Sequence, residues 1–484
     1  MKLRRTALLM APLSLCLLAL PAGAVSTAPQ WHAAKPITLP TGATGLPDGF
    51  LPALSCPSAG NCSAGGAYNT SGGDVEGLVL SEVKGVWRAP IRLTPPSQAD
   101  TNPSLTINSL SCATPGNCAA VGSFEDPKSN GQSFVANEVK GVWQRAQEVV
   151  LPTSPPATVQ NSEIHSVDCW SPGNCSAIGS YLDDNEPTGH AQGLEVNEVA
   201  GVWQRALETK VPSNANVNPY VDINQVACTH GGNCTAVGSY IDQNNATEGL
   251  VIPEVNGVWG AAAAAVLPGD ASAFPSADVS EVTCVSTANC TALGTFTDAA
   301  GDIEGMTLTE THGVWARALT MAMPASAAPN PHTFFYGYGG LSCASTGNCS
   351  AGGQYLVGTS SYEGFFINEV DGTWQTATEM AMPAGAEMAG RNGGVVAVSC
   401  RSAGNCSAGA AYLDGSSAYQ ALVLNEIAGH WRAGQKITLP TGNNTVGVDG
   451  GVYGLICHAT GPCTATGSYL KTLTNYEGFT VTTS

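Results

Sequence analysis

The chain has 484 residues and a formal net charge of −19, from 18 Lys and Arg against 37 Asp and Glu. This acidic excess argues against a nucleic-acid partner, which requires a basic footprint, and against electrostatic binding to anionic membranes. Hydrophobic residues make up 43% of the chain, which argues against intrinsic disorder because enough apolar surface is present to form a core.

The N-terminus has the composition of a secretory signal. A basic start, Met1 to Arg5, precedes an apolar run that reaches Leu20. The small residues Ala22-Gly23-Ala24 then form a typical cleavage site. We therefore predict a signal peptide over residues 1–24 and a secreted, extracellular chain over residues 25–484, with no membrane association after cleavage.

Beyond the signal, sixteen cysteines form eight pairs of the type C-x5-C. Most pairs carry Gly-Asn just before the second cysteine, which is typical of a tight hairpin turn. Zinc is the alternative, but zinc sites use closer pairs, often with His, and the His residues here are scattered. In an oxidising compartment we predict one disulfide per hairpin. The predicted pairs are Cys56 with Cys62, Cys112 with Cys118, Cys169 with Cys175, Cys228 with Cys234, Cys284 with Cys290, Cys343 with Cys349, Cys400 with Cys406 and Cys457 with Cys463.

These pairs mark a repeat, since the first cysteine recurs every 56 to 59 residues. In each unit the second residue after the second cysteine is Ala and the sixth is Tyr or Phe. This even spacing places both residues on one face of a strand. An E-x-x-G-x-W motif follows and predicts a two-residue primed turn between two further strands. Each unit is therefore predicted to contain four antiparallel strands, which we call a to d.

Two features of the repeat have competing interpretations. The alanines after Trp259 favour a helix by propensity, but their phase places them in strand d, and we follow the phase. A Glu stands five residues before each Trp of the motif. We interpret it as architectural, for example as a hydrogen bond across a turn, rather than as catalytic.

The two ends of the chain share one unit. The eighth unit ends before it reaches a strand d, whereas the segment that starts at Trp31 matches the strand d that starts at Trp431. An open solenoid would gain nothing from this division, but a closed ring would. We therefore predict an all-β, eight-bladed β-propeller of four-stranded antiparallel blades over residues 25–484, in which the N-terminal strand completes the last blade.

The repeat resembles the broad family of kelch and galactose-oxidase-like propellers. The resemblance rests on Gly65-Gly66 and Gly352-Gly353, each followed by an aromatic residue and later by a Trp. Most units have one Gly there, and the cysteine hairpin is not part of the kelch motif. The resemblance implies an architecture and supplies no function.

Candidate sites are sought where the repeat breaks. The longest d–a loop precedes the sixth cysteine pair and gathers five candidate ligand-binding residues, namely His332, Phe334, Phe335, Tyr336 and Tyr338. Exposed aromatic clusters stack on sugars or anchor protein partners; the alternative is that they pack into the channel and seal it. The acidic loop from Asp183 to His190 is the candidate for calcium, with a solvated loop as the favoured alternative. We otherwise expect no cofactor and no metal.

Three functions are consistent with this sequence. We expect a monomeric, non-enzymatic binding protein that recognises an extracellular polysaccharide or a surface protein through its d–a and b–c loop face, because no catalytic motif is recognised. The first alternative is an extracellular glycoside hydrolase or lyase with carboxylates at the channel mouth, such as Asp222 and Asp449. The second is a structural exoprotein without a specific ligand.

Overall fold

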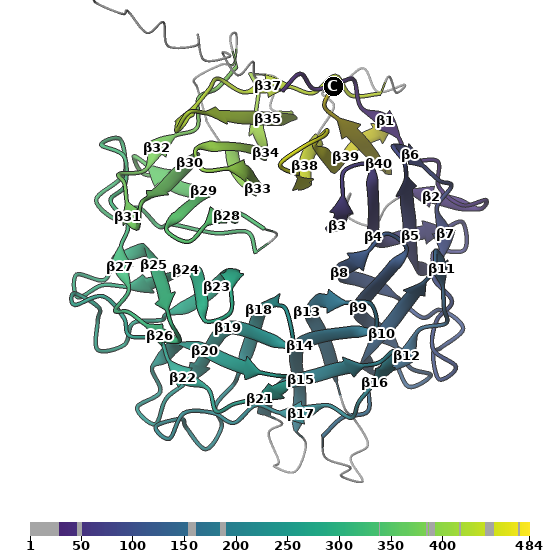
Figure 1. The fold of residues 1–484 in the computed structure, drawn as a ribbon, viewed down its shortest axis with the longest axis horizontal. Coiled ribbons are helices and arrows are strands. Elements are labelled where there is room, and N and C mark those ends of the chain that lie inside the picture. Colours follow the sequence, from purple (N-terminus) through teal and green to yellow (C-terminus); the bar gives the residue numbers. More distant parts are fainter. Residues whose placement is uncertain are drawn as a thin grey trace, which may run out of the picture.

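The structure is a computed structural model that describes residues 29–45, 51–152, 161–183, 190–337, 339–383, 386, 393–415, 418–440, 450–472 and 475–484. These residues form strands and turns without a helix. Eight separate sheets stand around a central opening (Figure 1), and each sheet is antiparallel. The predicted eight-bladed propeller is thus confirmed.

The strands of each blade run outward from the axis in chain order. The innermost strands a are β3 (Ala53–Ser58), β8 (Thr106–Thr114), β13 (Ser162–Ser171), β18 (Asp222–Thr229), β23 (Asp278–Ser286), β28 (Leu341–Ser345), β33 (Gly393–Ser402) and β38 (Gly450–Ile456). The strands b are β4 (Asn61–Thr70), β9 (Asn117–Glu125), β14 (Asn174–Asp183), β19 (Asn233–Ile241), β24 (Asn289–Thr297), β29 (Asn348–Val357), β34 (Asn405–Leu413) and β39 (Thr464–Thr472).

The strands c follow outside these. They are β5 (Val75–Val83), β10 (Gly131–Val139), β15 (His190–Val199), β20 (Thr247–Val255), β25 (Ile303–Thr311), β30 (Ser361–Val370), β35 (Tyr419–Ile427) and β40 (Asn475–Thr482). A short strand β2 (Ala43–Gly45) also pairs with the end of β4 in the first blade.

Strand d is broken into two short pieces in the first seven blades, and both pieces pair with strand c. The pieces are β6 (Val86–Trp87) and β7 (Ile91–Arg92), β11 (Val142–Trp143) and β12 (Gln147–Glu148), β16 (Val202–Trp203) and β17 (Leu207–Glu208), β21 (Val258–Trp259) and β22 (Ala263–Ala264), β26 (Val314–Trp315) and β27 (Leu319–Thr320), β31 (Thr373–Trp374) and β32 (Thr378–Glu379), and β36 (His430–Trp431) and β37 (Gln435–Lys436). The alanines after Trp259 thus lie in β22, as the phase predicts.

The ring closes where the two ends of the chain meet. The strand β1 (Lys35–Pro36) pairs antiparallel with β40, with Lys35 opposite Thr480. Trp31 forms a bridge with Thr483, and the His32 amide donates to the Thr482 carbonyl at 3.0 Å. The prediction that the N-terminal strand completes the last blade is therefore confirmed.

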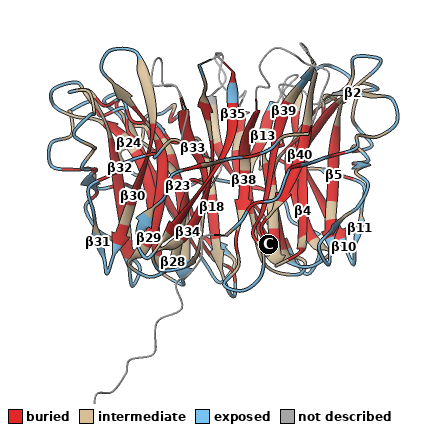
Figure 2. Cartoon of the chain, turned by 90° about the horizontal axis from the view of Figure 1, so that it is seen from above, coloured by how far each residue is buried: buried red, intermediate tan, exposed pale blue. Residues whose placement is uncertain are grey.

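Burial explains why the repeat alternates small and aromatic residues in strand b. The alanine two residues after the second cysteine, for example Ala64 or Ala120, has no exposed surface in any blade, and Tyr240 and Phe296 four residues further along are equally buried. Both faces of a blade pack against neighbouring blades, so Figure 2 shows buried strands and exposed connections. Alanine lets adjacent sheets approach closely, and the aromatic ring fills the wider space.

All eight predicted disulfides are present, with Cα–Cα distances between 3.9 and 4.2 Å. Each joins the end of strand a to strand b of its own blade, and none links two blades. The bonded pairs are Cys56 and Cys62, Cys112 and Cys118, Cys169 and Cys175, Cys228 and Cys234, Cys284 and Cys290, Cys343 and Cys349, Cys400 and Cys406, and Cys457 and Cys463.

The two cysteines of a pair differ in their surroundings. The second cysteine is buried in every blade, and these buried residues are Cys62, Cys118, Cys175, Cys234, Cys290, Cys349, Cys406 and Cys463. Hydroxyl groups of the preceding blade approach several of them, with Ser63 Oγ 3.6 Å from Cys118 Sγ and Ser350 Oγ 3.4 Å from Cys406 Sγ. These cysteines therefore belong to the packed contact between blades.

The Asn before the second cysteine supports the neighbouring turn between strands c and d. In the first blade the Asn61 Oδ1 accepts the Lys84 amide at 3.1 Å, and the Gly60 carbonyl accepts the Gly85 amide. Lys84 and Gly85 both have positive φ, which is the primed turn that the motif predicts.

The repeated Glu is buried and joins neighbouring blades, rather than bonding only across its own turn. The Glu254 carboxylate accepts hydrogen bonds from Ser176 and Asn197 of the preceding blade, both at 2.6 Å. The Asn197 Oδ1 in turn accepts the Trp259 indole at 2.8 Å. The same Glu, Asn and Trp arrangement recurs between other blades, for example around Asn368. Its role is architectural, as we expected, but the partner lies in another unit.

No helix of the described residues is both long and apolar enough to cross a membrane.

Replacing Asn197 by Ala should lower the free energy of unfolding by about 3 kcal/mol, because one oxygen of the Glu254 carboxylate and the Trp259 indole lose their partner inside the protein. Chemical denaturation measures this change. Gln204→Ala is the matched control, since Gln204 is exposed on the same blade and its side chain donates to the nearby Val202 carbonyl, not to another blade. Equal stability of the two variants would show that this bridge contributes nothing.

Candidate active site at the channel mouth

The inner strands break the repeat at the residues that face the channel. The residue six places before the first cysteine is Glu163, Asp222 and Asp278 in the third to fifth blades, but Gly337, Gly394 and Gly451 in the sixth to eighth blades. Four places before the cysteine stand Asn108, His165, Asn224 and Ser280 in the second to fifth blades. The wall of the channel is therefore polar and acidic on one side only.

A β-bulge places this second set of residues. The pairing of β13 with β14 skips from Ile164 to Ser166, so His165 has no opposite residue. The same skip occurs in β8 at Asn108, in β18 at Asn224 and in β23 at Ser280. A bulge turns one side chain out of the regular alternation, and here it leaves that side chain free to line the channel.

A cavity of about 570 Å³ is lined by polar residues of these two sets, namely Asn108, Glu163, His165, Asn224, Asp278 and Ser280, together with Phe334 and Tyr336. Asp222 is not among its lining residues but lies 3.5 Å from His165. A second cavity of about 280 Å³ continues along the channel and shares Asn108, His165 and Asn224 with the first. Strands β18 and β23 begin at Asp222 and Asp278. The cavity thus opens at the mouth where the d–a loops enter the inner strands.

His165 lies among two carboxylates and a backbone carbonyl. Its Nδ1 is 2.9 Å from the carbonyl oxygen of Ile223 in the next blade and 3.5 Å from Asp222 Oδ1. Because a carbonyl oxygen only accepts, Nδ1 carries the hydrogen. The Nε2 atom lies 4.0 Å from Glu163 Oε2. Asn108 Nδ2 donates to Glu163 Oε1 at 2.7 Å and thereby fixes that carboxylate.

Asp278 and Asp222 occupy equivalent positions in different surroundings. Asp278 is partly buried and accepts hydrogen bonds from Asn224 Nδ2 at 2.8 Å and from Ser280 Oγ at 2.9 Å. Burial raises the pKa of Asp278, and the charge of Asp222 raises it further. The Asp222 side chain is 59% exposed. Two carboxyl groups in such different surroundings are suited to act as an acid and a base.

The aromatic candidates take different positions. Phe334 is 49% exposed and meets Tyr336 edge-on, with ring centroids 5.3 Å apart. Tyr336 donates its hydroxyl to Gln354 Oε1 at 2.6 Å, and burial raises the pKa of Tyr336 to about 12. A Cβ on Gly394 would lie 2.5 Å from the Tyr336 hydroxyl, so this glycine is needed for the ring to fit.

The remaining predicted residues contribute less to the cavity. Phe335 also borders it, but it is 5% exposed and packs edge-on against Phe365. His332 Nδ1 lies 3.1 Å from the Tyr362 hydroxyl and is not part of the cavity lining. Tyr338 and Asp449 lie outside the described residues, as do residues 184–189 of the predicted calcium loop. Binding by the aromatic set therefore stays a prediction.

Sequence reasoning named Asp222 but missed Glu163, His165, Asn224 and Asp278. The signal was available, because Glu163 and Asp278 stand six places before the first cysteine, where the sixth to eighth blades have glycine, and His165 and Asn224 stand at a second fixed offset. These positions differ from one unit to the next, so the repeat pattern does not mark them.

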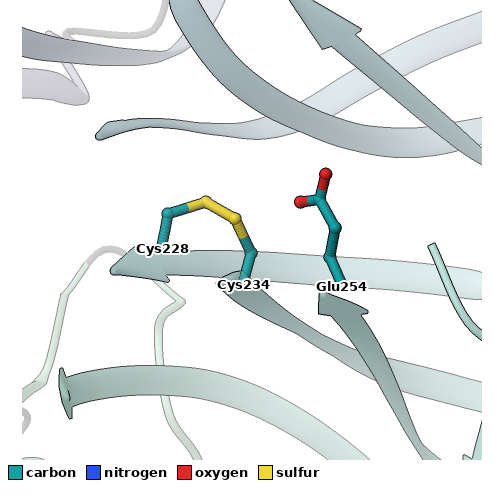
Figure 3. Close-up of side chains that lie close together, drawn as sticks. All are labelled: Cys228, Cys234 and Glu254. Atoms are coloured by element: carbon teal, nitrogen blue, oxygen red, sulfur yellow. A yellow bond between two sulfur atoms is a disulfide. The ribbon is translucent and has the colours of Figure 1, made fainter. Parts of the chain in front are cut away.

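Among the described residues, one group of Cys, His, Asp or Glu side chains is dense enough to suggest a metal, and Figure 3 shows it. Cys228 and Cys234 are joined to each other in a disulfide, so neither offers a thiolate. The Glu254 oxygens are already bonded to Ser176 and Asn197, and burial raises the pKa of Glu254 to about 7. This group is part of the contact between blades rather than a metal site.

A comparison with known proteins finds no matching family model and no matching curated sequence. Similar solved structures include an ulvan lyase, a polysaccharide lyase that is 9% identical, with 93% of this chain and 95% of that chain covered and a TM-score of 0.47. The fucose-specific lectin from Aleuria aurantia is 13% identical over 71% of this chain and 99% of that chain, with a TM-score of 0.32. A Trypanosoma rangeli sialidase is 10% identical over 81% of this chain and 57% of that chain, with a TM-score of 0.35.

The expectation of a non-enzymatic protein is contradicted by these comparisons. The similar structures include a polysaccharide lyase and sialidases, which are enzymes. Our expectation relied on the lack of a catalytic motif. In a propeller this is weak evidence, because groups that meet at the channel come from different blades and have no short spacing in the sequence.

Glu281 is a buried carboxyl group beside the loop that carries the aromatic residues. It is 1% exposed, and the backbone of Gly337, Gly340 and Leu341 lies beside it without a well-aligned hydrogen bond to either carboxylate oxygen. Burial is the main cause that raises the pKa of Glu281 to about 7. The carboxyl group therefore keeps its proton in the folded chain at pH values where it is already ionised in the unfolded chain.

This difference makes stability depend on pH. Between the ordinary pKa of 4.5 and the folded value of about 7, the folded state holds the proton more tightly, so the free energy of unfolding falls as the pH rises. Glu281→Gln should abolish this contribution, which lowers the free energy of unfolding of the parent chain by up to about 3 kcal/mol as the pH rises. Urea unfolding of both proteins at pH 5 and pH 8 measures the effect, with Asp371→Asn on an exposed turn as control. If the free energies of unfolding of Glu281→Gln and of the parent chain differed by the same amount at pH 5 and at pH 8, the raised pKa of Glu281 would be contradicted.

Proposed function

We propose that this protein is an extracellular glycan-cleaving enzyme, a glycoside hydrolase whose active centre is the cavity at the channel mouth. One observation carries this proposal. Asp278, whose pKa is raised mainly by burial, lines the cavity, and the exposed Asp222 begins the adjacent inner strand 3.5 Å from His165, which also lines the cavity. Hydrolysis of a glycosidic bond requires two such carboxyl groups, one that donates a proton and one that activates water.

The roles follow from the surroundings of each group. Asp278 donates its proton to the glycosidic oxygen as the sugar leaves. Asp222 accepts the proton of the water that attacks the anomeric carbon, so the reaction balances with one water consumed. His165, 3.5 Å from Asp222 Oδ1, is a positioning residue for that carboxylate. Phe334 and Tyr336 provide the aromatic surface against which a sugar ring stacks.

Hydrolysis fits this cavity better than a lyase reaction. Elimination from a uronic acid needs a group that neutralises the sugar carboxylate, most often a cation. Neither cavity has Lys or Arg among its described lining residues. The amides of Asn108 and Asn224 are already bonded to Glu163 and Asp278.

Export and a monomeric state complete the proposal. The eight disulfides fit an oxidising compartment. The signal peptide over residues 1–24 is part of the proposal, and mass spectrometry of the exported chain would test it. The polysaccharide partner is also part of the proposal, and glycan assays would test it. The kelch-like relationship remains part of the proposal as well.

Asp278→Asn should reduce glycan hydrolysis at least about 100-fold, because the amide cannot transfer a proton to the glycosidic oxygen, while glycan binding is retained. Release of reducing ends from a panel of polysaccharides measures the activity, and calorimetry measures the binding. Asp371→Asn, on an exposed turn between strands c and d, is the matched control. The activity of the parent chain should fall as the pH rises through the raised pKa of Asp278, because Asp278 then loses the proton that it donates. Full activity of Asp278→Asn would refute the proposed role.

A further inference from the structure

The cavity at the channel mouth has a carboxylate that the proposed hydrolysis does not use. Asp278 and Asp222 suffice for the chemistry, but Glu163 also lines the cavity, and its side chain is 46% exposed. Asn108 orients Glu163 Oε1 at 2.7 Å, and Oε2 lies 4.0 Å from His165 Nε2. A carboxylate that is oriented by an amide and has no Lys or Arg beside it in the cavity lining is suited to hold a positive charge on a ligand.

The surroundings strengthen this negative potential. The described residues that line both cavities include neither Lys nor Arg, and the whole chain has a net charge of −19. A concave wall with one sign of charge focuses the field and concentrates ligands of the opposite sign. Anionic sugars would be repelled for the same reason, and neutral sugars would gain only a hydrogen bond to Glu163, which is weaker than an ion pair with an ammonium group.

The aromatic part of the cavity lining, Phe334 and Tyr336, suits a sugar ring that is apolar on its face and cationic at its edge. Phe334 is half exposed, and Tyr336 stands edge-on to it with Gly394 directly behind its ring. Aromatic rings stack on the apolar face of a sugar and also attract a nearby ammonium group. A sugar placed between these rings and Glu163 would direct a substituent toward the carboxylate.

We propose, building on the proposed hydrolase function, that the preferred substrate is a cationic glycan with free amino groups, of the glucosamine-oligomer type. Glu163 pairs with a sugar ammonium group, and Phe334 and Tyr336 stack on the ring. Glu163 is the residue that determines specificity, whereas Asp278 and Asp222 perform the chemistry. The preference thus depends on a different residue from the cleavage.

Calorimetry on the full-length Asp278→Asn protein tests this preference without turnover. The probes are a glucosamine hexamer, its N-acetylated counterpart and a galacturonate oligomer. We expect the amino hexamer to bind at least tenfold more tightly than the acetylated one, with the difference shrinking as salt rises. The galacturonate oligomer should bind weakest. Equal or tighter binding of the acetylated or anionic oligomer would overturn the inference.

A second variant separates the site from general attraction to an acidic protein. Adding Glu163→Gln should reduce the preference for the amino hexamer at least fivefold and leave acetylated binding unchanged, whereas adding Asp371→Asn should change neither. Equal effects of the two substitutions would overturn the role of Glu163. Because binding is measured on an inactive variant, a preference without any cleavage by the parent chain would refute the hydrolase alone. Cleavage without the preference would refute only the substrate class.

Discussion

The fold depends on the fact that every blade must bury two faces. A four-stranded sheet with Ala and aromatic residues buried throughout its second strand, such as Ala236 and Tyr240, has no face suited to water. Only a closed ring gives each sheet two neighbours, and only then is every such strand covered. The short blade at the end of the sequence must therefore recruit β1, and the pairing of Lys35 with Thr480 follows from this requirement.

The contact between blades is polar as well as apolar. A buried Glu carboxylate is costly unless it has hydrogen-bond partners, and in several blades the partners come from the preceding blade, as Ser63 and Ser81 do for Glu138. The arrangement fixes the relative height of neighbouring sheets. The cystine hairpins stiffen each unit at the same end of the propeller, since the Gly60 carbonyl of the hairpin accepts the Gly85 amide. The hydrogen bonds between blades and the cystine hairpins thus hold the sheets in place, so the residues that line the channel mouth can differ from blade to blade.

The architecture could be predicted because its signals are periodic. The phase of Trp259 outweighed the helical propensity of the following alanines, and β22 confirms that choice. The site could not be predicted in the same way. His165 and Asn224 leave the regular alternation through bulges, which the hydrophobic pattern does not reveal. The partner of the repeated Glu was also missed, because a contact between units has no fixed signature within one unit.

Ring closure also has a kinetic consequence. The pairing of β1 with β40 joins segments from opposite ends of the chain, and closing so long a loop costs roughly 5 kcal/mol of chain entropy. High contact order of this kind slows folding. Until the last strand has been synthesised, the eighth blade lacks its third strand and β1 lacks its partner, so the unfinished ring presents open sheet edges. Completion of the last blade therefore depends on the pairing of β1 with β40, two segments that lie far apart in the sequence.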